Sequence, residues 1–316
     1  MGKTAFLFPG QGSQYVGMGS DLAAAHPAAA RLFEAADRTL GFALTESMFG
    51  TGNPDSDALA LRQTDVTQPA LYVHSLAVMA VLAGSGISCE MAAGHSLGEY
   101  SALAAAGAIS FEDGLRIVRL RGRLMAEAGR LRPGGMAAVI GTEDALIEQV
   151  CAEVTSQGGV VQPANYNSPG QVVISGDQAA IEQATALLAE RGARKVVPLP
   201  VSGAFHSPLM EHARAGLEEA LSTLDLRAPG VPVYLNVTAR ATTDPSEIRA
   251  RLLEQLLEPV RWTQILQAMA TDGATRFVEI GAGRVLSGLA KRTLGREAET
   301  LAIGTLDDFE ALTQAT

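Results

Sequence analysis

The chain has 316 residues, of which 47% are hydrophobic and 18% are charged, so it can bury a sizeable core and is not expected to be disordered. Its formal net charge is -10, and we expect no nucleic-acid partner because binding to phosphates needs a dominant basic surface. Its two cysteines, Cys89 and Cys151, are far apart in the sequence, which argues against a disulfide framework and against a zinc site.

Two apolar segments bear on export and on membrane insertion. Residues 5–8 form an apolar run that Pro9 and Gly10 end, and this run is too short for the core of a signal peptide. Residues 70–87 form the longest apolar stretch, but small and polar residues interrupt it, so we expect a buried helix there rather than a membrane span. We expect no membrane partner, and the cysteine pattern then predicts a cytoplasmic protein.

Short apolar runs alternate with helix-length periodic segments along most of the chain. This alternation is typical of an α/β fold in which helices cover a mainly parallel sheet. The runs expected to form buried strands are residues 5–8, 91–93, 233–236 and 276–280.

Residues 134–201 follow a different order. The expected elements are a strand at 136–140, a helix at 143–156, strands at 160–165 and 171–175, a helix at 178–191 and a strand at 195–201. The two middle strands meet at Asn167-Ser168-Pro169-Gly170, whose residues are strong turn formers. This βαββαβ order is the ferredoxin-like arrangement. We therefore expect a ferredoxin-like subdomain at 133–201, inserted into a larger α/β body formed by 1–132 and 202–316.

The segment Gly94-His95-Ser96-Leu97-Gly98 joins the strand at 91–93 to an alanine-rich helix at 100–106. In a nucleophile elbow the serine lies on a strained strand-to-helix turn, and flanking glycines allow the strand and the helix to approach closely. Such a turn also directs the Ser96 hydroxyl and the Leu97 backbone N–H to one place near a helix N-terminus. G-x-S-x-G is common by chance, but this context favours a nucleophile over an ordinary turn.

A serine nucleophile needs a base, and the chain has five histidines. Four of them have a packing or surface explanation or are directed away by the turn; these are His26, His74, His95 and His212. His206 follows the expected strand at 195–201 and precedes Ser207-Pro208, a good start for a helix. Catalytic side chains often project from loops of this kind, so we interpret His206 as the base.

The helix expected at 113–128 carries four arginines, and helical spacing separates them. Arg121 falls on the apolar face, whereas the other three form a stripe, so Arg121 is expected to be buried. A buried guanidinium must be paired, either with a structural carboxylate or with one that arrives on a substrate. Considered alone, the structural partner is the better interpretation.

The first strand leads into the glycine-flanked loop at 8–14, which can bring backbone N–H groups close to a ligand. Tyr15 breaks the dinucleotide-binding pattern and Met18 stands where a P-loop needs lysine, so nucleotide phosphates are not its obvious target. A second oxyanion donor, from Gln11, fits better. No acidic residue stands out as a third triad member, and a backbone carbonyl could orient the base instead.

Five motifs occur in order along nearly the whole chain. They are Phe8-Pro9-Gly10-Gln11-Gly12-Ser13-Gln14, Gly94-His95-Ser96-Leu97-Gly98-Glu99, Asn165-Tyr166-Asn167-Ser168-Pro169-Gly170-Gln171, Gly203-Ala204-Phe205-His206-Ser207 and Gln255 in Glu254-Gln255-Leu256-Leu257-Glu258-Pro259-Val260. Together they resemble the malonyl-CoA:acyl carrier protein transacylases of fatty acid synthesis. The resemblance implies a hydrolase-like α/β body with a ferredoxin-like subdomain, which agrees with the elements expected above.

The resemblance implies a serine acyltransferase that works in two half-reactions. Malonyl passes from coenzyme A to the serine and then to the phosphopantetheine thiol of acyl carrier protein. No cofactor is implied, because malonyl-CoA is a substrate and the phosphopantetheine belongs to the partner. The family's nucleophile and base fall on Ser96 and His206, and its oxyanion donors fall on the backbones of Gln11 and Leu97.

Three further residues take roles from the resemblance. It assigns Arg121 to the free carboxylate of malonate, which reverses the structural interpretation given above. It assigns the backbone carbonyl of Gln255 to the orientation of His206, in place of the missing acid. Phe205 adjoins the base, and in related acyltransferases phenylalanine here accompanies malonyl whereas serine accompanies methylmalonyl.

The carrier protein in these reactions is acidic, so we expect it to dock on local basic residues despite the net charge of this chain. Arg191, Arg194 and Lys195 cluster where the second helix of the small subdomain meets its last strand. A solvated turn is the alternative explanation for this cluster, and it is slightly favoured.

Three other functions are compatible with parts of the sequence. Water can release an acyl-serine, so a hydrolase is the main rival, although a simple esterase has no need of Arg121. An acyltransferase that loads a polyketide synthase would share the chemistry and differ in its partner. A non-catalytic docking protein is disfavoured by the intact Ser96, His206 and Arg121.

Overall fold

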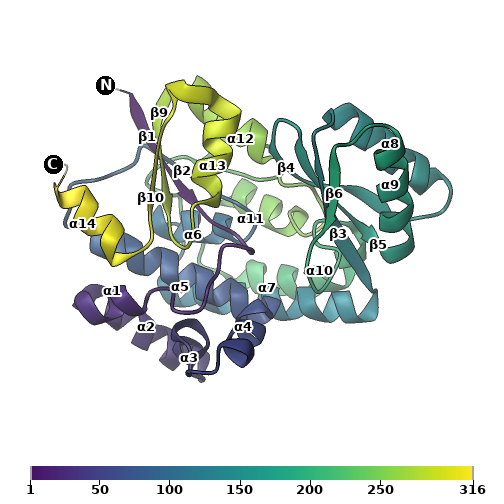
Figure 1. Cartoon of the computed structure of the whole chain (residues 1–316). Helices are drawn as coiled ribbons and strands as arrows, with labels where there is room; N and C mark the ends of the chain where they lie inside the picture. Colours follow the sequence, from purple (N-terminus) through teal and green to yellow (C-terminus); the bar gives the residue numbers. More distant parts are fainter. Residues whose placement is uncertain (1, 315–316) are drawn as a thin grey trace.

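The structure is a computed structural model that describes residues 2–314. Residues 1 and 315–316 of the predicted body lie outside the described residues. The body contains a six-stranded sheet with the order β10-β9-β1-β2-β7-β8. Its strands are β1 Lys3–Phe8, β2 Met91–Gly94, β7 Val233–Tyr234, β8 Ala241–Thr242, β9 Ala274–Ile280 and β10 Glu299–Ile303. Figure 1 labels β10, β9, β1 and β2 among them. Neighbouring strands run parallel except β7 and β8, so the expected mainly parallel α/β fold is confirmed.

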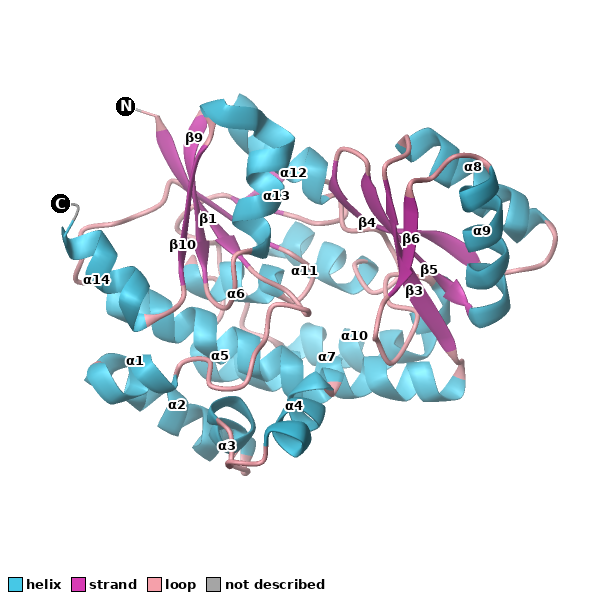
Figure 2. Ribbon diagram, viewed as in Figure 1, coloured by secondary structure: helices cyan, strands magenta, loops and turns pink. Residues whose placement is uncertain are grey.

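Helices cover both faces of this sheet (Figure 2). Successive side chains of a strand point to opposite faces, and β1 shows the consequence. Ala5 and Leu7 pack in the cluster that contains α12 and α13, whereas Phe6 and Phe8 pack in the cluster that contains α5 and α6. The helices and short 3-10 turns of the body are α1 Ser20–Ala25, α2 Pro27–Leu40, α3 Leu44–Phe49, α4 Pro54–Arg62, α5 Thr64–Leu82, α6 Gly98–Ala105, α7 Phe111–Leu131, η1 Pro208–Met210, α10 Glu211–Thr223, α11 Pro245–Glu254, α12 Trp262–Thr271, α13 Val285–Leu294, η2 Gly295–Glu297 and α14 Leu306–Gln314.

The βαββαβ segment forms a separate antiparallel sheet with the order β4-β5-β3-β6. Its elements are β3 Gly134–Ile140, α8 Asp144–Ser156, β4 Val161–Ser168, β5 Gln171–Asp177, α9 Gln178–Glu190 and β6 Lys195–Pro198. Ala137 and Val139 of β3 pack under α8 and α9, whereas Met136 and Ala138 join the main core of the body. One face of the small sheet is therefore directed at the body. The division of the chain at 132/133 and 201/202 stays a prediction.

Several strand boundaries differ from the expected ones. β7 ends at Tyr234 rather than at residue 236, because the chain turns at residues 235–239 and returns as the unpredicted β8. β6 ends at Pro198 rather than at residue 201, because Pro198 and Pro200 lack the N–H that a strand ladder needs. The edge strand β10 is an additional strand that was not expected from the sequence; its apolar run is only residues 301–303, and most of its side chains are only partly buried.

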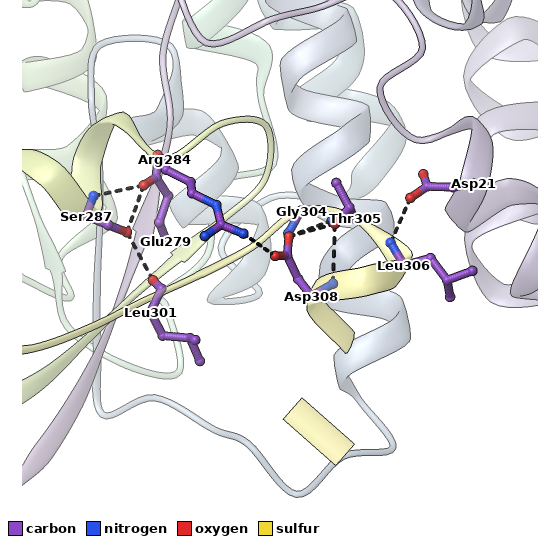
Figure 3. Close-up of polar contacts among 9 residues, drawn as sticks. All are labelled: Asp21, Glu279, Arg284, Ser287, Leu301, Gly304, Thr305, Leu306 and Asp308. Atoms are coloured by element: carbon purple, nitrogen blue, oxygen red, sulfur yellow. Dashed lines mark hydrogen bonds and ion pairs between the residues drawn. The ribbon is translucent and has the colours of Figure 1, made fainter. Parts of the chain in front are cut away.

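Polar contacts fix the last elements against the carboxyl end of the sheet (Figure 3). Glu279, at the end of β9, accepts hydrogen bonds from the backbone N–H of Ser287 at 2.8 Å and from its hydroxyl at 2.9 Å. A carboxylate at this position satisfies free N–H groups at the start of α13. Asp308 likewise accepts from the backbone N–H and the hydroxyl of Thr305 at the start of α14. Within residues 2–314, no helix has the length and apolar character needed to cross a membrane.

Candidate active site

The turn between β2 and α6 has the geometry of a nucleophile elbow. Ser96 has a φ of 52°, in the left-handed region that non-glycine residues seldom adopt. A Cβ at Gly94 would lie 1.8 Å from the backbone of Gly98, and a Cβ at Gly98 would lie 2.0 Å from the carbonyl oxygen of Phe8. Glycine is therefore required on both sides of Ser96. The close approach of strand and helix expected from the sequence is present.

His206 lies within hydrogen-bonding distance of Ser96. Its Nε2 is 2.8 Å from the Ser96 Oγ, and its Nδ1 is 2.7 Å from the backbone oxygen of Gln255. A carbonyl oxygen can only accept, so Nδ1 carries the proton and the lone pair of Nε2 faces the serine hydroxyl. Burial, followed by the nearby charge of Arg121, lowers the pKa of His206 to about 3. The imidazole is thus neutral at neutral pH and able to accept a proton.

The Arg121 side chain is buried, as its place on the apolar face of α7 predicted. Its guanidinium donates to the side-chain oxygens of Gln68 at 2.8 Å and Gln255 at 2.9 Å, and to the Ser96 Oγ at 3.1 Å. Among the described residues, no carboxylate lies within ion-pair distance of Arg121, and its Nε has no hydrogen-bond partner. The guanidinium is therefore buried beside the serine without a direct ion pair, and the charge closest to a counter-ion is the buried carboxylate of Glu99, which interacts with it electrostatically. Glu99 and Arg121 both hydrogen-bond to the side chain of Gln255, so this carboxylate is connected to Arg121 through Gln255 rather than by direct contact.

One pocket brings these residues together between the body and the small sheet. It is lined by Gln11, Gln68, His95, Ser96, Leu97, Arg121, Met125, Met136, Asn165, Leu199, Val201, Phe205 and His206. The two residues expected to supply oxyanion donors, Gln11 and Leu97, thus lie at the same pocket as Ser96. Phe205 also lines it, and the residue is at the same time a buried member of the main hydrophobic core. Leu199 and Val201 follow β6, so the small sheet contributes to one wall.

Other expected residues lie elsewhere or make different contacts. The Nε2 of His95 is 2.8 Å from the side-chain oxygen of Asn167, so the elbow histidine points toward the small sheet and away from Ser96. Arg191 forms an ion pair with Glu153 at 2.8 Å, whereas Arg194 and Lys195 are exposed. None of these three basic residues lines the pocket.

The sequence reasoning missed two buried polar residues next to the elbow, Asn236 and Glu99. The Asn236 Oδ1 accepts the backbone N–H of Ser96 at 2.7 Å. Glu99 accepts from the backbone N–H of Asn236 at 2.8 Å and from the side chain of Gln255 at 3.1 Å. Glu99 stood inside a recognised motif, but its contacts come from residues far away in the sequence. Asn236 lies in the turn after β7, whereas it was expected at the end of a strand at residues 233–236, and this turn brings its side chain to the elbow.

The comparisons with known proteins agree with this geometry. Residues 5–307 match the family described as the acyl transferase domain. Over 314 residues the chain is 46% identical to the malonyl CoA-acyl carrier protein transacylase of Bacillus subtilis, covering 99% of this chain and 97% of the relative. It is 40% identical to the protein of the same name from Staphylococcus aureus, covering 98% of each chain.

Solved structures are similar over the whole length. The malonyl-CoA:acyl carrier protein transacylase of Xanthomonas oryzae has a TM-score of 0.93 and 45% identity, and covers 100% of this chain and 98% of that chain. A second structure, of a malonyl-transacylase in complex with its type II polyketide synthase acyl carrier protein, has a TM-score of 0.92 and 38% identity. That match covers 99% of this chain and 100% of that chain.

Proposed function

The chain belongs to the acyl transferase domain family, and from that membership we propose that it carries malonyl from malonyl-CoA to acyl carrier protein through a malonyl ester on Ser96. The reaction is the one that the relatives' names give, and it supplies malonyl units to fatty acid synthesis. The observation that supports malonyl as the acyl group is the buried Arg121 guanidinium, which makes no direct ion pair with any described residue and lies 3.1 Å from the Ser96 Oγ.

In the first half-reaction the Ser96 Oγ attacks the thioester carbonyl carbon while the Nε2 of His206 takes the hydroxyl proton. The carbonyl oxygen becomes an oxyanion, which the backbone N–H groups of Gln11 and Leu97 stabilise; one such donor contributes about 10²–10³-fold in rate. The carbonyl then re-forms, the C–S bond breaks, and the leaving coenzyme A thiolate receives the proton from His206. Malonyl is now held as an ester of Ser96.

The second half-reaction reverses the roles of oxygen and sulfur. The phosphopantetheine thiol of the carrier protein gives its proton to His206 and attacks the ester carbonyl. The C–O bond to Ser96 breaks, and the serine oxygen takes the proton back. The backbone oxygen of Gln255 holds the Nδ1–H of His206 throughout, so the imidazole keeps the tautomer that each step needs. Every step uses side-chain and backbone groups of the chain, and we propose that no cofactor takes part.

The domain organisation and the cellular location belong to the same proposal. Residues 133–201 act as an inserted subdomain whose sheet closes one side of the acyl pocket, which the pocket-lining Met136, Leu199 and Val201 support. The protein works in a reducing, cytoplasmic setting, which the unpaired Cys89 and Cys151 support.

The transfer itself is tested by mixing the protein with malonyl-CoA and the phosphopantetheine-bearing carrier protein and measuring the mass of the carrier protein over time. We expect the carrier protein to gain a malonyl group. With acetyl-CoA in place of malonyl-CoA we expect slow transfer, because acetyl brings no carboxylate to Arg121. Equal transfer of both acyl groups would contradict the proposed role of the arginine.

Changing Phe205 to serine is expected to narrow the preference for malonyl over methylmalonyl. The phenyl ring fills space at the pocket that an α-methyl group would need, and one methyl in a shaped pocket is worth about 10–200-fold in specificity. The measurement is competing acylation of Ser96 by the two thioesters, read by intact mass. An unchanged ratio in a folded and active variant would show that other residues set the choice.

The carrier protein is proposed to dock on the exposed Arg194 and Lys195. The third basic residue, Arg191, already forms an ion pair with Glu153. Reversing both Arg194 and Lys195 to glutamate is expected to raise the KM for the carrier protein and to leave the KM for malonyl-CoA unchanged. The physical reason is that like charges across an interface disfavour encounter with an acidic partner.

A matched control reverses two charges far from β6. Arg31 and Arg38 lie on α2, on the opposite side of the molecule from β6 (Figure 1), and both are largely solvent-exposed. Glutamate at both positions changes the net charge by the same amount. If this control raised the KM for the carrier protein as much as the Arg194 and Lys195 reversal, the effect would be general repulsion and the docking site would lie elsewhere.

A further inference from the structure

The parallel pairing of β2 with β7 brings Asn236 next to the nucleophile elbow. Ala93 of β2 is paired with Tyr234 of β7, so the residues that follow the two strands also lie side by side. On one strand that continuation is the elbow, and on the other it is the turn that contains Asn236. The Asn236 side chain is fully buried and is not among the residues that line the acyl pocket.

The carboxamide of Asn236 bridges Gly94 and Ser96, on the strand side of the elbow. Its Oδ1 accepts the backbone N–H of Ser96 at 2.7 Å, and its Nδ2 donates to the backbone oxygen of Gly94 at 2.7 Å. A residue in the left-handed region is strained, and this conformation persists only where surrounding contacts over-determine it. Ser96 is such a residue, with a φ of 52°. The two hydrogen bonds of Asn236 are contacts of the required kind.

Glu99 holds Asn236 in turn. Its Oε2 accepts the backbone N–H of Asn236 at 2.8 Å and the side-chain amide of Gln255 at 3.1 Å. The same amide donates to the backbone oxygen of Ser96 at 3.1 Å, and the backbone oxygen of Gln255 receives the Nδ1–H of His206. One carboxylate oxygen is thus connected both to the backbone of the nucleophile and to the residue that orients the base.

We propose that Asn236 and Glu99 are positioning residues that keep the Ser96 hydroxyl within hydrogen-bonding distance of the His206 Nε2. Asn236 fixes the backbone on the strand side of Ser96, and Gln255 binds the Ser96 backbone oxygen. Glu99 holds Asn236 and Gln255 in place relative to each other. This proposal rests on the proposed function, because it requires Ser96 to be the acylated residue. Neither side chain touches the substrate, so their loss affects the rate of acylation and leaves the binding of malonyl-CoA intact.

In this role Glu99 holds Asn236 and Gln255 through its acceptor oxygen rather than through its charge. Burial raises the pKa of Glu99 to about 7, so the carboxyl group is partly neutral at neutral pH. Glutamine in its place retains an oxygen for both donors, namely the N–H of Asn236 and the amide of Gln255. Leucine retains the approximate volume and provides no acceptor. The pair Glu99→Gln and Glu99→Leu therefore separates the hydrogen bonds from the packing.

The experiment measures single-turnover malonylation of Ser96 at several malonyl-CoA concentrations, by rapid quenching and intact mass. We expect Asn236→Leu to lower the limiting rate by about 10²-fold, the effect of a displacement near 1 Å at a reacting group, with no change in the half-saturating concentration. The limiting rate of Glu99→Leu is expected to fall by a similar factor. The limiting rate of Glu99→Gln is expected to lie close to that of the unchanged protein. The control is Ser101→Ala, which removes a buried hydroxyl of α6 that has no hydrogen-bond partner among the described residues.

The outcomes separate this proposal from the proposed function. If the unchanged protein takes up no malonyl, the proposed function fails. If it does, and Asn236→Leu is folded by circular dichroism yet acylates at the unchanged rate, the positioning role is wrong. A rise in the half-saturating concentration in proportion to the loss of rate would also contradict it. Should Asn236→Leu not fold, the Glu99 pair decides: a Glu99→Gln variant as slow as Glu99→Leu would overturn the role of the acceptor oxygen.

Discussion

The Ser96→Ala variant is expected to fold normally and to gain no mass when it is mixed with malonyl-CoA. The substitution removes the oxygen that lies 2.8 Å from the Nε2 of His206 and leaves the rest of the site in place. Loss of the nucleophile of a serine enzyme lowers turnover by up to about 10⁶-fold. Intact mass of the protein after incubation reports the adduct directly, and transfer to the carrier protein reports the turnover.

The fold of this variant is checked by its thermal unfolding, because a misfolded protein would also fail to react. Alanine at residue 96 meets the same left-handed backbone as serine, so we expect no additional backbone strain. Ser101→Ala changes a serine of α6, the helix that follows the elbow; it serves again as the matched control and is expected to acquire the malonyl group. A stable adduct on Ser96→Ala would move the nucleophile to another residue.

Arg121→Ala is expected to lose malonyl transfer. Its ratio of acetyl to malonyl transfer is expected to be higher than that of the unchanged protein. In the proposed complex the malonyl carboxylate replaces water and pairs with the buried guanidinium. Leaving one partner of a buried pair without the other costs about 3–5 kcal/mol, which is about two to three and a half orders of magnitude in rate. Acetyl-CoA has no carboxylate to leave unpaired. The measurement is the ratio of kcat/KM for the two thioesters.

The control for this variant is Arg119→Ala on the same helix. Arg119 pairs with Asp65 at 2.9 Å and is partly exposed, so its loss removes a positive charge of α7 outside the pocket. We expect its ratio of malonyl to acetyl transfer to stay unchanged. Equal decreases for both thioesters in Arg121→Ala would make Arg121 a structural residue that supports Gln68 and Gln255 rather than the substrate.

The parts of the fold that follow local rules could be predicted from the sequence. The elbow is specified by glycines two positions on either side of Ser96, since no other residue fits where β2 and α6 meet. The order of the small sheet follows from alternating apolar runs and a turn of strong turn formers at residues 167–170. Burial of Arg121 follows from its place on the apolar face of α7.

The partners of Arg121 and His206 could not be predicted from local patterns. Whether a buried arginine has a structural carboxylate depends on which residues α5 and the end of α11 bring to it, and both contribute glutamines, Gln68 and Gln255. Asn236 is near Ser96 only because β7 is adjacent to β2. Strand order and register are properties of the assembled sheet, so no local pattern in the sequence indicates that Asn236 contacts Ser96.

The central claim is that malonyl is held on Ser96 until a thiol accepts it. It is tested by loading the protein with malonyl-CoA, removing free coenzyme A and following the intact mass in buffer, before and after addition of the phosphopantetheine-bearing carrier protein. The account predicts that the malonyl-enzyme persists in buffer and disappears on addition of the carrier protein, as the carrier protein gains the same mass. Decay at the same rate with and without the carrier protein, with release of free malonate, would contradict it and identify a hydrolase.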